Sequence, residues 1–441
     1  MNENEKSCAK ILGQTSNGIQ VSATAGRIST TEGTAFSVFN KGEDNNEANV
    51  KLISKVLGSG HKTIIEHHNF SIGFNNVSII VEQFLIEFRL TSFTIKSRRY
   101  VDFSNAGYYM PEIEKISDRD LFENTTKNLF ASYKELMDKG LIKEDARFIL
   151  PYNFNSNILM SCNARELMHI ICTMIYGRGR DYSEIYNLGI QLKEQFDEIY
   201  PDIIEKEKFK YEKYHSIKAS PITINPQNIA YVDSEVELVS NTENIDKVIN
   251  TALQIENLEN FDIKQLITDG KLARVLEQIN FTFAIKNITL ASLTHITRHR
   301  IHSLIVPNLQ TIINENKYKI APNILENEEY LEIYKKAIEE TNKTILNLKH
   351  LDPQTLSYLY VSGRTIDIMT TMNARELLWF FKLRTCDRAQ WEIRDIAKQM
   401  LKLVKNKFPN IFKLFGPSCL VEGFCPEGRL TCGKLKTEDD F

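Results

Sequence analysis

Two stretches of the chain repeat one order of apolar and polar positions. Alternating apolar residues predict strands at Phe70 to Phe74 and at Phe281 to Ile285. A mostly apolar segment follows each strand, at Val77 to Phe88 and at Ile288 to Ile296, and a basic region comes next. Strand and helix signals within one stretch predict a mixed α+β domain, and this pattern occurs twice.

A long helix is predicted to begin at the motif Asn373-Ala374-Arg375-Glu376-Leu377. Asn373 is a favourable N-cap residue, and Glu376 stands three positions later, as in a capping box. Apolar residues from Leu377 to Leu383 then follow at helical spacing. We predict that this helix runs to about Lys407, before Pro409, since proline cannot continue it.

Self-comparison indicates that the whole pattern is duplicated. Glu66, Asn69, Phe70, Arg89 and Ser92 recur 211 positions later as Glu277, Asn280, Phe281, Arg300 and Ser303. The motif at 163–167 recurs at 373–377, an offset of 210. Such a period corresponds to a whole domain rather than to a solenoid unit. We therefore predict two tandem domains, 1–215 and 216–441, joined at the charged stretch from Glu205 to Lys218.

Composition indicates a globular protein and gives no bulk signal for nucleic acid or membranes. The chain has 441 residues, 42% of them hydrophobic, and a formal net charge of −3. The negative charge argues against nucleic acid as a partner, so any bound anion must meet a local basic cluster. No apolar run approaches the ~20 residues of a membrane span, and the polar start lacks a signal-peptide core. Together with seven mostly scattered cysteines, this predicts a cytoplasmic protein.

Two basic clusters have the chemistry of phosphate sites. Arg298-His299-Arg300 places two forked guanidinium groups beside an apolar segment. In the first copy, Ser97-Arg98-Arg99-Tyr100 offers a hydroxyl and guanidinium groups to one phosphate. A solvated basic turn and an exposed strand end would contain the same residues, so both interpretations stay open at this point.

Arg384 follows the apolar run of the predicted helix, so its side chain is expected to be partly buried. Burying a cation is costly unless an anion pairs with it, either a ligand or an acidic residue such as Glu392. His61, Thr63 and Glu66 form a compact polar set before the first strand. This set either contacts a ligand or closes a helix end through local hydrogen bonds.

Three cysteines near the end of the chain raise the question of a metal. Cys419, Cys425 and Cys432 follow the spacing C-x5-C-x6-C, which is not a standard zinc spacing. A metal site would need a fourth ligand, such as Cys386 or a water. We favour unligated thiols and predict no metal, with these three cysteines as the candidate ligands if one is bound.

The residues named above resemble those of the flavin-dependent thymidylate synthases. The first copy carries the run from Gly60-His61 through Glu66-His67, then Phe70, Gln83, Arg89 and Ser97-Arg98-Arg99-Tyr100. The second copy carries Arg298-His299-Arg300, Asn373-Ala374-Arg375, Leu383-Arg384 and Ala389-Gln390-Trp391-Glu392-Ile393. The last of these runs is highly specific, and the likeness covers nearly the whole chain, twice.

This resemblance implies reductive methylation of dUMP to dTMP. The implied carbon donor is methylenetetrahydrofolate, and the implied reductant is FAD recharged by NADPH. It also implies that Arg384 is catalytic, because a guanidinium favours the ionised pyrimidine ring. The implied flavin contacts are Thr63, Glu66, Arg298, His299, Arg300, Asn373 and Arg375. The implied dUMP contacts are Gln83, Ser97, Arg98, Arg99, Arg147 and Arg384.

Neither copy carries the complete set of these residues, and the losses are complementary. In the first copy the triplet reads Glu87-Phe88-Arg89, and Thr173-Met174 stands where the family has Leu-Arg. In the second copy Asn308-Leu309-Gln310 replaces Ser-x-Arg, and Ser357 replaces Arg147. We therefore predict composite sites, in which the first copy supplies the serine and phosphate-binding arginines and the second supplies the triplet and Arg384.

The resemblance also implies self-association. Members of the family form homotetramers, so two duplicated chains are expected to form a dimer equivalent to a pseudo-tetramer. The alternative is a paralogue that binds flavin or a pyrimidine nucleotide without catalysis, or with altered specificity. Ile95 and Val306 favour this alternative because the family has an acidic residue there. Arg178 and Arg388 favour it because many members have a histidine at that position.

Overall fold

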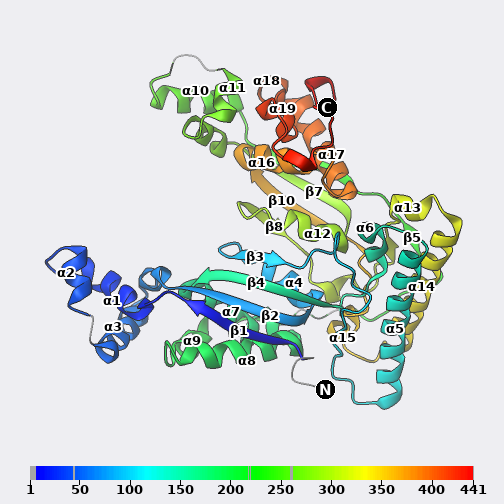
Figure 1. Cartoon of the computed structure of the whole chain (residues 1–441), viewed down its shortest axis with the longest axis horizontal. Coiled ribbons are helices and arrows are strands. Elements are labelled where there is room, and N and C mark those ends of the chain that lie inside the picture. The colour runs from blue at the N-terminus through cyan, green and yellow to red at the C-terminus, as the bar shows by residue number, and fades with distance from the viewer. Residues whose placement is uncertain (1–5, 43–44, 217, 219, 259–261, 441) are drawn as a thin grey trace. The chain divides into compact units, whose positions relative to one another are not determined.

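The computed structural model of the chain describes residues 6–42, 45–216, 218, 220–258 and 262–440 (Figure 1). The chain folds into two compact units. Unit 1 comprises Met1–Ile224 together with Glu328–Val361, and unit 2 comprises Asn225–Asn327 together with Ser362–Phe441. Unit 1 therefore includes a segment of the second sequence repeat. The boundary predicted near residue 215 concerns the repeats and stays a prediction.

Each unit contains a four-stranded antiparallel sheet, and the two sheets have equivalent strand orders. The order in unit 1 is β1 (Cys8–Gln14), β2 (Asn69–Ser78), β4 (Asn155–Asn163), β3 (Ser92–Ile95). The order in unit 2 is β6 (Glu235–Asn241), β7 (Asn280–Thr289), β10 (Thr365–Asn373), β8 (His302–Ile305). Unit 2 also has the short parallel pair β5 (Ala230–Tyr231) and β9 (Lys317–Tyr318). The predicted strands lie within β2 and β7, which confirms a tandem α+β fold.

A shared backbone irregularity shows how closely the two sheets correspond. The pairing of β2 with β4, and that of β7 with β10, shifts register once near the end of the strand. There Asn76 and Asn287 adopt left-handed conformations, with φ of 52° and 55°. Asparagine tolerates this region better than most residues. The two residues are separated by the same offset of 211 as the repeated sequence motifs.

Helices pack against each sheet and carry most of the residues of interest. The α-helices of unit 1 are α1 (Gly18–Ile28), α2 (Ala35–Asn40), α3 (Asn46–Gly58), α4 (Ile79–Ile86), α5 (Ile116–Asp138), α6 (Lys143–Ala146), α7 (Ala164–Ile175), α8 (Ser183–Asp197), α9 (Ile203–Glu207), α14 (Glu328–Asn347) and α15 (Pro353–Ser357). Those of unit 2 are α10 (Ile245–Ile255), α11 (Ile263–Thr268), α12 (Leu290–Ile296), α13 (Pro322–Leu325), α16 (Ala374–Arg384), α17 (Trp391–Lys407), α18 (Pro409–Phe412) and α19 (Ser418–Glu422). The 3₁₀ helices are η2 (Thr63–His67), η3 (Arg147–Ile149), η4 (Arg178–Asp181), η5 (Lys208–Lys210), η6 (Leu272–Gln278), η7 (Leu309–Ile312), η8 (Gly428–Leu430) and η9 (Glu438–Asp440). Equivalent helices, α8 and α17, pack against the edge strands β1 and β6.

The second repeat contributes α14 to unit 1, where this helix lies along α5 (Figure 1). Thr125 and Thr344 share a buried hydrogen bond of 2.8 Å between these two helices. Pro151 and Val361, which are 210 positions apart, form an isolated antiparallel bridge. Equivalent positions of the two repeats thus pair with each other inside unit 1. Among the described residues, no helix has the length and apolar composition of a membrane span.

The prediction of one helix from residue 373 to about Lys407 is wrong. The structure has two helices, because α16 ends at Arg384 and α17 begins at Trp391. Thr385 Oγ1 donates to the Phe381 carbonyl at 2.7 Å at the end of α16. The side chain of Gln390 accepts from the Ile393 amide and caps α17. Residues 385–390 contain neither glycine nor proline, so the sequence contains no signal for this break. The prediction relied on the apolar spacing, which did not reveal where the first helix ends.

A buried carboxylate fixes the start of α17 against the sheet. Glu392 is fully buried and accepts hydrogen bonds from the Thr289 amide at 2.9 Å and from the hydroxyls of Thr289, Ser292 and Ser234. Its repeat counterpart, Glu184, accepts from the Ser78 amide at 2.9 Å in unit 1. A buried charge is tolerated when several donors surround it. The glutamate of the Ala-Gln-Trp-Glu-Ile run therefore serves the fold.

Replacing Glu392 is expected to destabilise the protein. Glu392→Gln removes the charge that strengthens these hydrogen bonds and sets an amide N–H group against donors. The free energy of unfolding should fall by about 1.5–3 kcal/mol. Chemical denaturation measures this change, with the exposed Glu235→Gln as control, for which less than about 0.5 kcal/mol is expected. Equal stability of the two variants would contradict the role given to Glu392.

Candidate functional site

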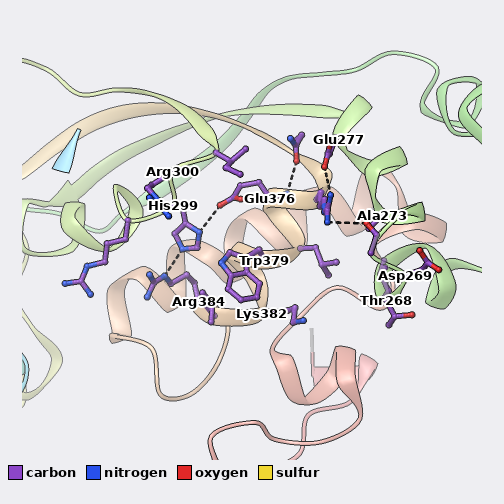
Figure 2. Close-up of a pocket in the computed structure, with 18 residues that line it drawn as sticks. Thr268, Asp269, Ala273, Glu277, His299, Arg300, Glu376, Trp379, Lys382 and Arg384 are labelled. Atoms are coloured by element: carbon purple, nitrogen blue, oxygen red, sulfur yellow. Dashed lines mark hydrogen bonds and ion pairs between the residues drawn. The ribbon is translucent and has the colours of Figure 1, made fainter. Parts of the chain in front are cut away.

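Unit 2 contains a cleft of about 890 Å³ lined by three segments of the chain (Figure 2). One wall comes from α11 and η6, the second from the turn after α12, and the third from α16. The lining residues are Ile267, Thr268, Asp269, Gly270, Ala273, Glu277, Arg298, His299, Arg300, Ile301, Asn373, Arg375, Glu376, Leu378, Trp379, Lys382, Leu383 and Arg384. All six second-repeat residues in the predicted flavin and catalytic sets line this one cleft.

The cleft is basic and carries one large aromatic surface. Five of its lining residues are arginine or lysine and three are aspartate or glutamate, so the excess of cations favours an anion. Arg375 pairs with Glu277 at 2.5 Å, which fixes its guanidinium at the η6 wall. Trp379 is 53% exposed, with the Lys382 ammonium 5.8 Å from its ring centroid. An exposed indole in a basic cleft can stack on an aromatic ring that carries phosphate.

Hydrogen bonds join three lining residues of the cleft, from Glu376 through His299 to Arg384 (Figure 2). His299 Nδ1 lies 3.0 Å from Glu376 Oε1, and Arg384 Nε lies 3.1 Å from His299 Nε2. Because arginine can only donate, Nε2 accepts and Nδ1 donates to the carboxyl group. Burial, with the nearby Arg384 charge, lowers the pKa of His299 to about 3. The histidine is therefore neutral, and it orients Arg384 without adding charge.

Burial raises the pKa of Glu376, whereas it lowers that of His299. It raises the pKa of this carboxyl group to about 7, because the charged form loses hydration at the start of α16. Asn373 caps the helix by accepting from the Glu376 amide at 2.8 Å, as predicted. The Glu376 side chain bonds to His299, which is not the contact that a capping box assigns to this glutamate. The local fold thus delivers a titratable group beside the neutral histidine.

The structure shows the surroundings of two groups in unit 2 whose interpretation the sequence left open. The triplet is not a fully solvated turn, since His299 is buried while Arg298 and Arg300 are exposed at the cleft. The alternative ion pair of Arg384 with Glu392 is not the arrangement found. Glu392 is instead surrounded by Thr289, Ser292 and Ser234, as described above.

The predicted nucleotide residues of the first repeat meet near α6 in unit 1. Arg99 pairs with the Glu144 carboxylate at 3.2 Å, and Arg147 Nε donates to the Glu144 carbonyl at 3.0 Å. Ser97 Oγ accepts from the Arg99 amide at 3.3 Å. Ser97, Arg99 and Arg147 are thus brought together around one helix turn. Their role as a phosphate site stays a prediction.

The remaining first-repeat residues have varied surroundings. Arg98 is buried and pairs with the buried Glu82 at 2.7 Å, which directs its guanidinium into the core. Gln83 is buried and donates to Glu87 at 3.1 Å. Thr63 is exposed in η2, and Glu66 pairs with Arg165 at 2.5 Å in unit 1. The described contacts of these residues lie within unit 1, and their ligand roles stay predictions.

Sequence reasoning missed several residues of the cleft, chiefly Asp269, Glu277, Trp379 and Lys382. Glu277 was recoverable, because it is the repeat partner of Glu66 at the offset of 211, just as Arg375 is the partner of Arg165 at the offset of 210. Each repeat keeps this glutamate–arginine ion pair, at 2.5 Å in both units. Trp379 and Lys382 carried no comparable signal, because their counterparts are His169 and Cys172.

The cysteines give no metal site among the described residues. Within that part of the chain, no group of three or more histidine, cysteine, aspartate or glutamate side chains has the arrangement of a metal centre. Cys419 and Cys425 are half-buried and Cys432 is exposed, all as free thiols. These thiols are not gathered as ligands in this structure.

The fold and the cleft define a duplicated α+β protein with a basic cleft in its second unit. Comparison with known proteins identifies the family: the model described as thymidylate synthase complementing protein, Thy1, matches at residues 10–202 and again at 226–410. The chain belongs to this family, which confirms the resemblance seen in the sequence. Similar curated proteins are flavin-dependent thymidylate synthases.

Three relatives illustrate the similarity. That of Clostridium tetani is 32% identical over 45% of this chain and 93% of its own length. That of Geobacter sulfurreducens is 37% identical over 36% of this chain and 71% of its own length. That of Sulfurisphaera tokodaii is 32% identical over 47% of this chain and 87% of its own length. Each relative is therefore matched over less than half of the duplicated chain.

Glu376 is expected to make stability depend on pH. Its folded pKa of about 7 exceeds the unfolded value of 4.5, so between these values the folded protein holds the extra proton. The stability contribution of Glu376 therefore falls as pH rises through this window, by roughly 3 kcal/mol in all. Glu376→Gln removes this dependence while keeping an acceptor for His299. Urea denaturation at several pH values measures it.

In that series the variant should gain stability relative to the parent protein as pH rises from about 4.5 to 7.5. The exposed Glu235→Gln serves as the control and should track the parent protein. An unchanged difference between parent and Glu376→Gln across the window would contradict the raised pKa.

Proposed function

We propose that this protein is a flavin-dependent thymidylate synthase, which converts dUMP to dTMP. The proposed carbon donor is methylenetetrahydrofolate, with FAD as cofactor and NADPH as reductant. The observation that carries the proposal is the basic cleft of unit 2, in which the family motifs converge on Arg384. Membership of the family and the names of its relatives support the same reaction.

The residues of the cleft fit a flavin dinucleotide. Its volume of about 890 Å³ lies in the range of cofactor pockets. Arg298, Arg300 and Arg375 would hold a pyrophosphate through forked donors, and Trp379 would stack on an aromatic ring. A bound flavin would supply the hydride that turns the transferred one-carbon group into a methyl group.

Arg384 would act on the nucleotide through its charge. Its Nε atom donates to the neutral His299, and this contact holds the guanidinium at the lining of the cleft. A fixed cation in a partly enclosed cleft stabilises negative charge that develops on a pyrimidine ring. The ring carbon then becomes nucleophilic without a cysteine nucleophile. His299 is a positioning residue in this proposal, and Glu376 sets its tautomer.

The second part of the proposal is a division of labour between the repeats. Ser97, Arg99 and Arg147 of the first repeat would bind the nucleotide phosphate, and Arg384 of the second would act on its ring. The complementary losses of motif residues support a shared site, because neither repeat retains both sets. Association of two chains into a pseudo-tetramer would supply the several subunit surfaces that such sites use.

A specific observation favours a second candidate function, nucleotide binding without turnover. Both repeats carry an apolar residue, Ile95 or Val306, at a position where the family resemblance implies an acidic one. Such a protein would bind flavin or a pyrimidine nucleotide and leave it unchanged. Turnover measurements separate the two functions.

The purified protein is expected to be yellow and to form dTMP. Anaerobic incubation with dUMP, methylenetetrahydrofolate and NADPH, assayed for dTMP, tests the reaction directly. A yellow protein whose NADPH oxidation does not depend on dUMP would indicate the binding function. A colourless protein that also fails to take up added FAD would exclude both flavin functions.

Single substitutions in either unit are expected to weaken dUMP binding. Arg384→Ala and Arg99→Ala each remove a charge-assisted contact, which should cost about 1.5–3 kcal/mol, or roughly 10- to 150-fold in Kd. Isothermal titration measures this, with the exposed Arg119→Ala and Arg429→Ala as controls in the two units. Unaltered affinity after either test substitution would refute the shared site.

A further inference from the structure

The segment that follows α8 lies across the first repeat's counterpart of the cleft. We call residues 203–214, which include α9 and η5, the strap. Its Glu207 is buried and forms an ion pair with Lys62, and Lys210 pairs with the same carboxylate at 2.8 Å. Tyr211 places its hydroxyl 2.7 Å from His169 Nδ1. All of these residues belong to unit 1.

The residues that hold the strap are the repeat counterparts of cleft residues. At the repeat offsets, Lys62 and His169 correspond to Ala273 and Trp379, both of which line the cleft of unit 2. Cys172 corresponds to Lys382 and is completely buried in unit 1. In unit 1, the positions equivalent to those that would contact a ligand in unit 2 are therefore occupied by residues that contact the strap or are buried.

The opposite end of the first-repeat region is closed by a different pair. Arg178 bridges to Glu87 at 2.9 Å and lies over the Phe84 ring at 4.5 Å. Glu87 is the counterpart of Arg298, and Phe88, the counterpart of His299, packs edge-on against His169 at 5.4 Å. At these two positions the first repeat thus has a negative charge and an apolar ring in place of a positive charge and an imidazole.

Unit 2 has an equivalent segment that leaves its cleft open. After α17 the chain continues through α18 and α19, and Glu422 of α19 pairs with Lys382 on the adjacent α16. The position that would complete a bridge to the η6 wall is Ala273, which has no charge to offer. Glu207 of the strap reaches Lys62 beside η2, whereas Glu422 in unit 2 forms its ion pair with Lys382 of α16.

We infer that the strap closes the first-repeat cleft, so that each chain binds one flavin, at the cleft of unit 2. The strap is then a built-in occupant: Glu207 takes the place of a ligand anion and Tyr211 that of a stacked ring. This inference rests on the proposed function for the identity of the ligand. The duplication therefore provides two folds but one cofactor cleft per chain.

Flavin stoichiometry tests the inference. The protein, stripped of cofactor and titrated with FAD, should bind one equivalent per chain, measured by absorbance after gel filtration. Two equivalents per chain would overturn the closed cleft and leave the proposed function standing. No binding would overturn the proposed function and, with it, the one-flavin inference.

A matched pair of substitutions locates the occupied cleft. Arg300→Ala should weaken FAD binding at least tenfold, as expected for one lost charge-assisted hydrogen bond. Arg89→Ala, at the equivalent position of the first repeat, should leave both affinity and stoichiometry unchanged. The reverse pattern would place the flavin in unit 1 and contradict the inference.

Thiol labelling tests the strap itself without any ligand. The double variant Glu207→Gln, Tyr211→Phe loses the ion pair and the histidine contact, so local opening should label Cys172 about tenfold faster with a maleimide. Cys162, buried in β4, serves as an internal control for global unfolding. Faster labelling of Cys172 alone supports the strap. An unchanged rate, or equal acceleration at both cysteines, contradicts it.

Discussion

The chemistry of unit 2 depends on a histidine that is too deeply buried to carry a charge. His299 accepts from Arg384 on one side and donates to Glu376 on the other, so its ring has a single orientation. A protonated imidazole would repel Arg384 and could not accept its hydrogen bond. The burial of this ring therefore fixes both its tautomer and the orientation of the Arg384 side chain. The first repeat has Phe88 and Met174 at these two positions and cannot build the same chain.

Much of the fold follows from local patterns that survive the divergence of the repeats. The strands at Phe70 and Phe281 were predictable because alternating burial has a period of two. The N-cap at Asn373 was predictable because its side chain satisfies a nearby amide. The break between α16 and α17 was not, since it depends on the side chains of Thr385 and Gln390 in three dimensions. The assignment of α14 to unit 1 depends on packing against α5, which no local pattern encodes.

The residues of the site also fall into those that the sequence could predict and those that it could not. Arg384 was identified because a charged residue beside an apolar run is costly without a partner. Arg298 was identified from the basic triplet, and Arg375 only from the family resemblance. Glu277 could have been added to the predicted site by applying the repeat offset to Glu66, which was already among the predicted flavin contacts. Trp379 could not, because an aromatic residue on an amphipathic helix reads as part of the core until the structure shows it 53% exposed. The alternative partner for Arg384, Glu392, was a reasonable choice from composition, but four nearby donors already satisfy that carboxylate.

The helix pair α5 and α14 has a consequence for how the chain matures. Unit 1 needs residues up to Val361, so its packing cannot be completed while only the first repeat has left the ribosome. Most of unit 2, from Asn225 to Asn327, is synthesised before that last piece arrives. Contacts between segments that are far apart in the sequence form slowly. The face of α5 that packs against α14 therefore stays uncovered for part of synthesis. Cutting the gene between the repeats would therefore yield a first half that lacks a helix of its own core.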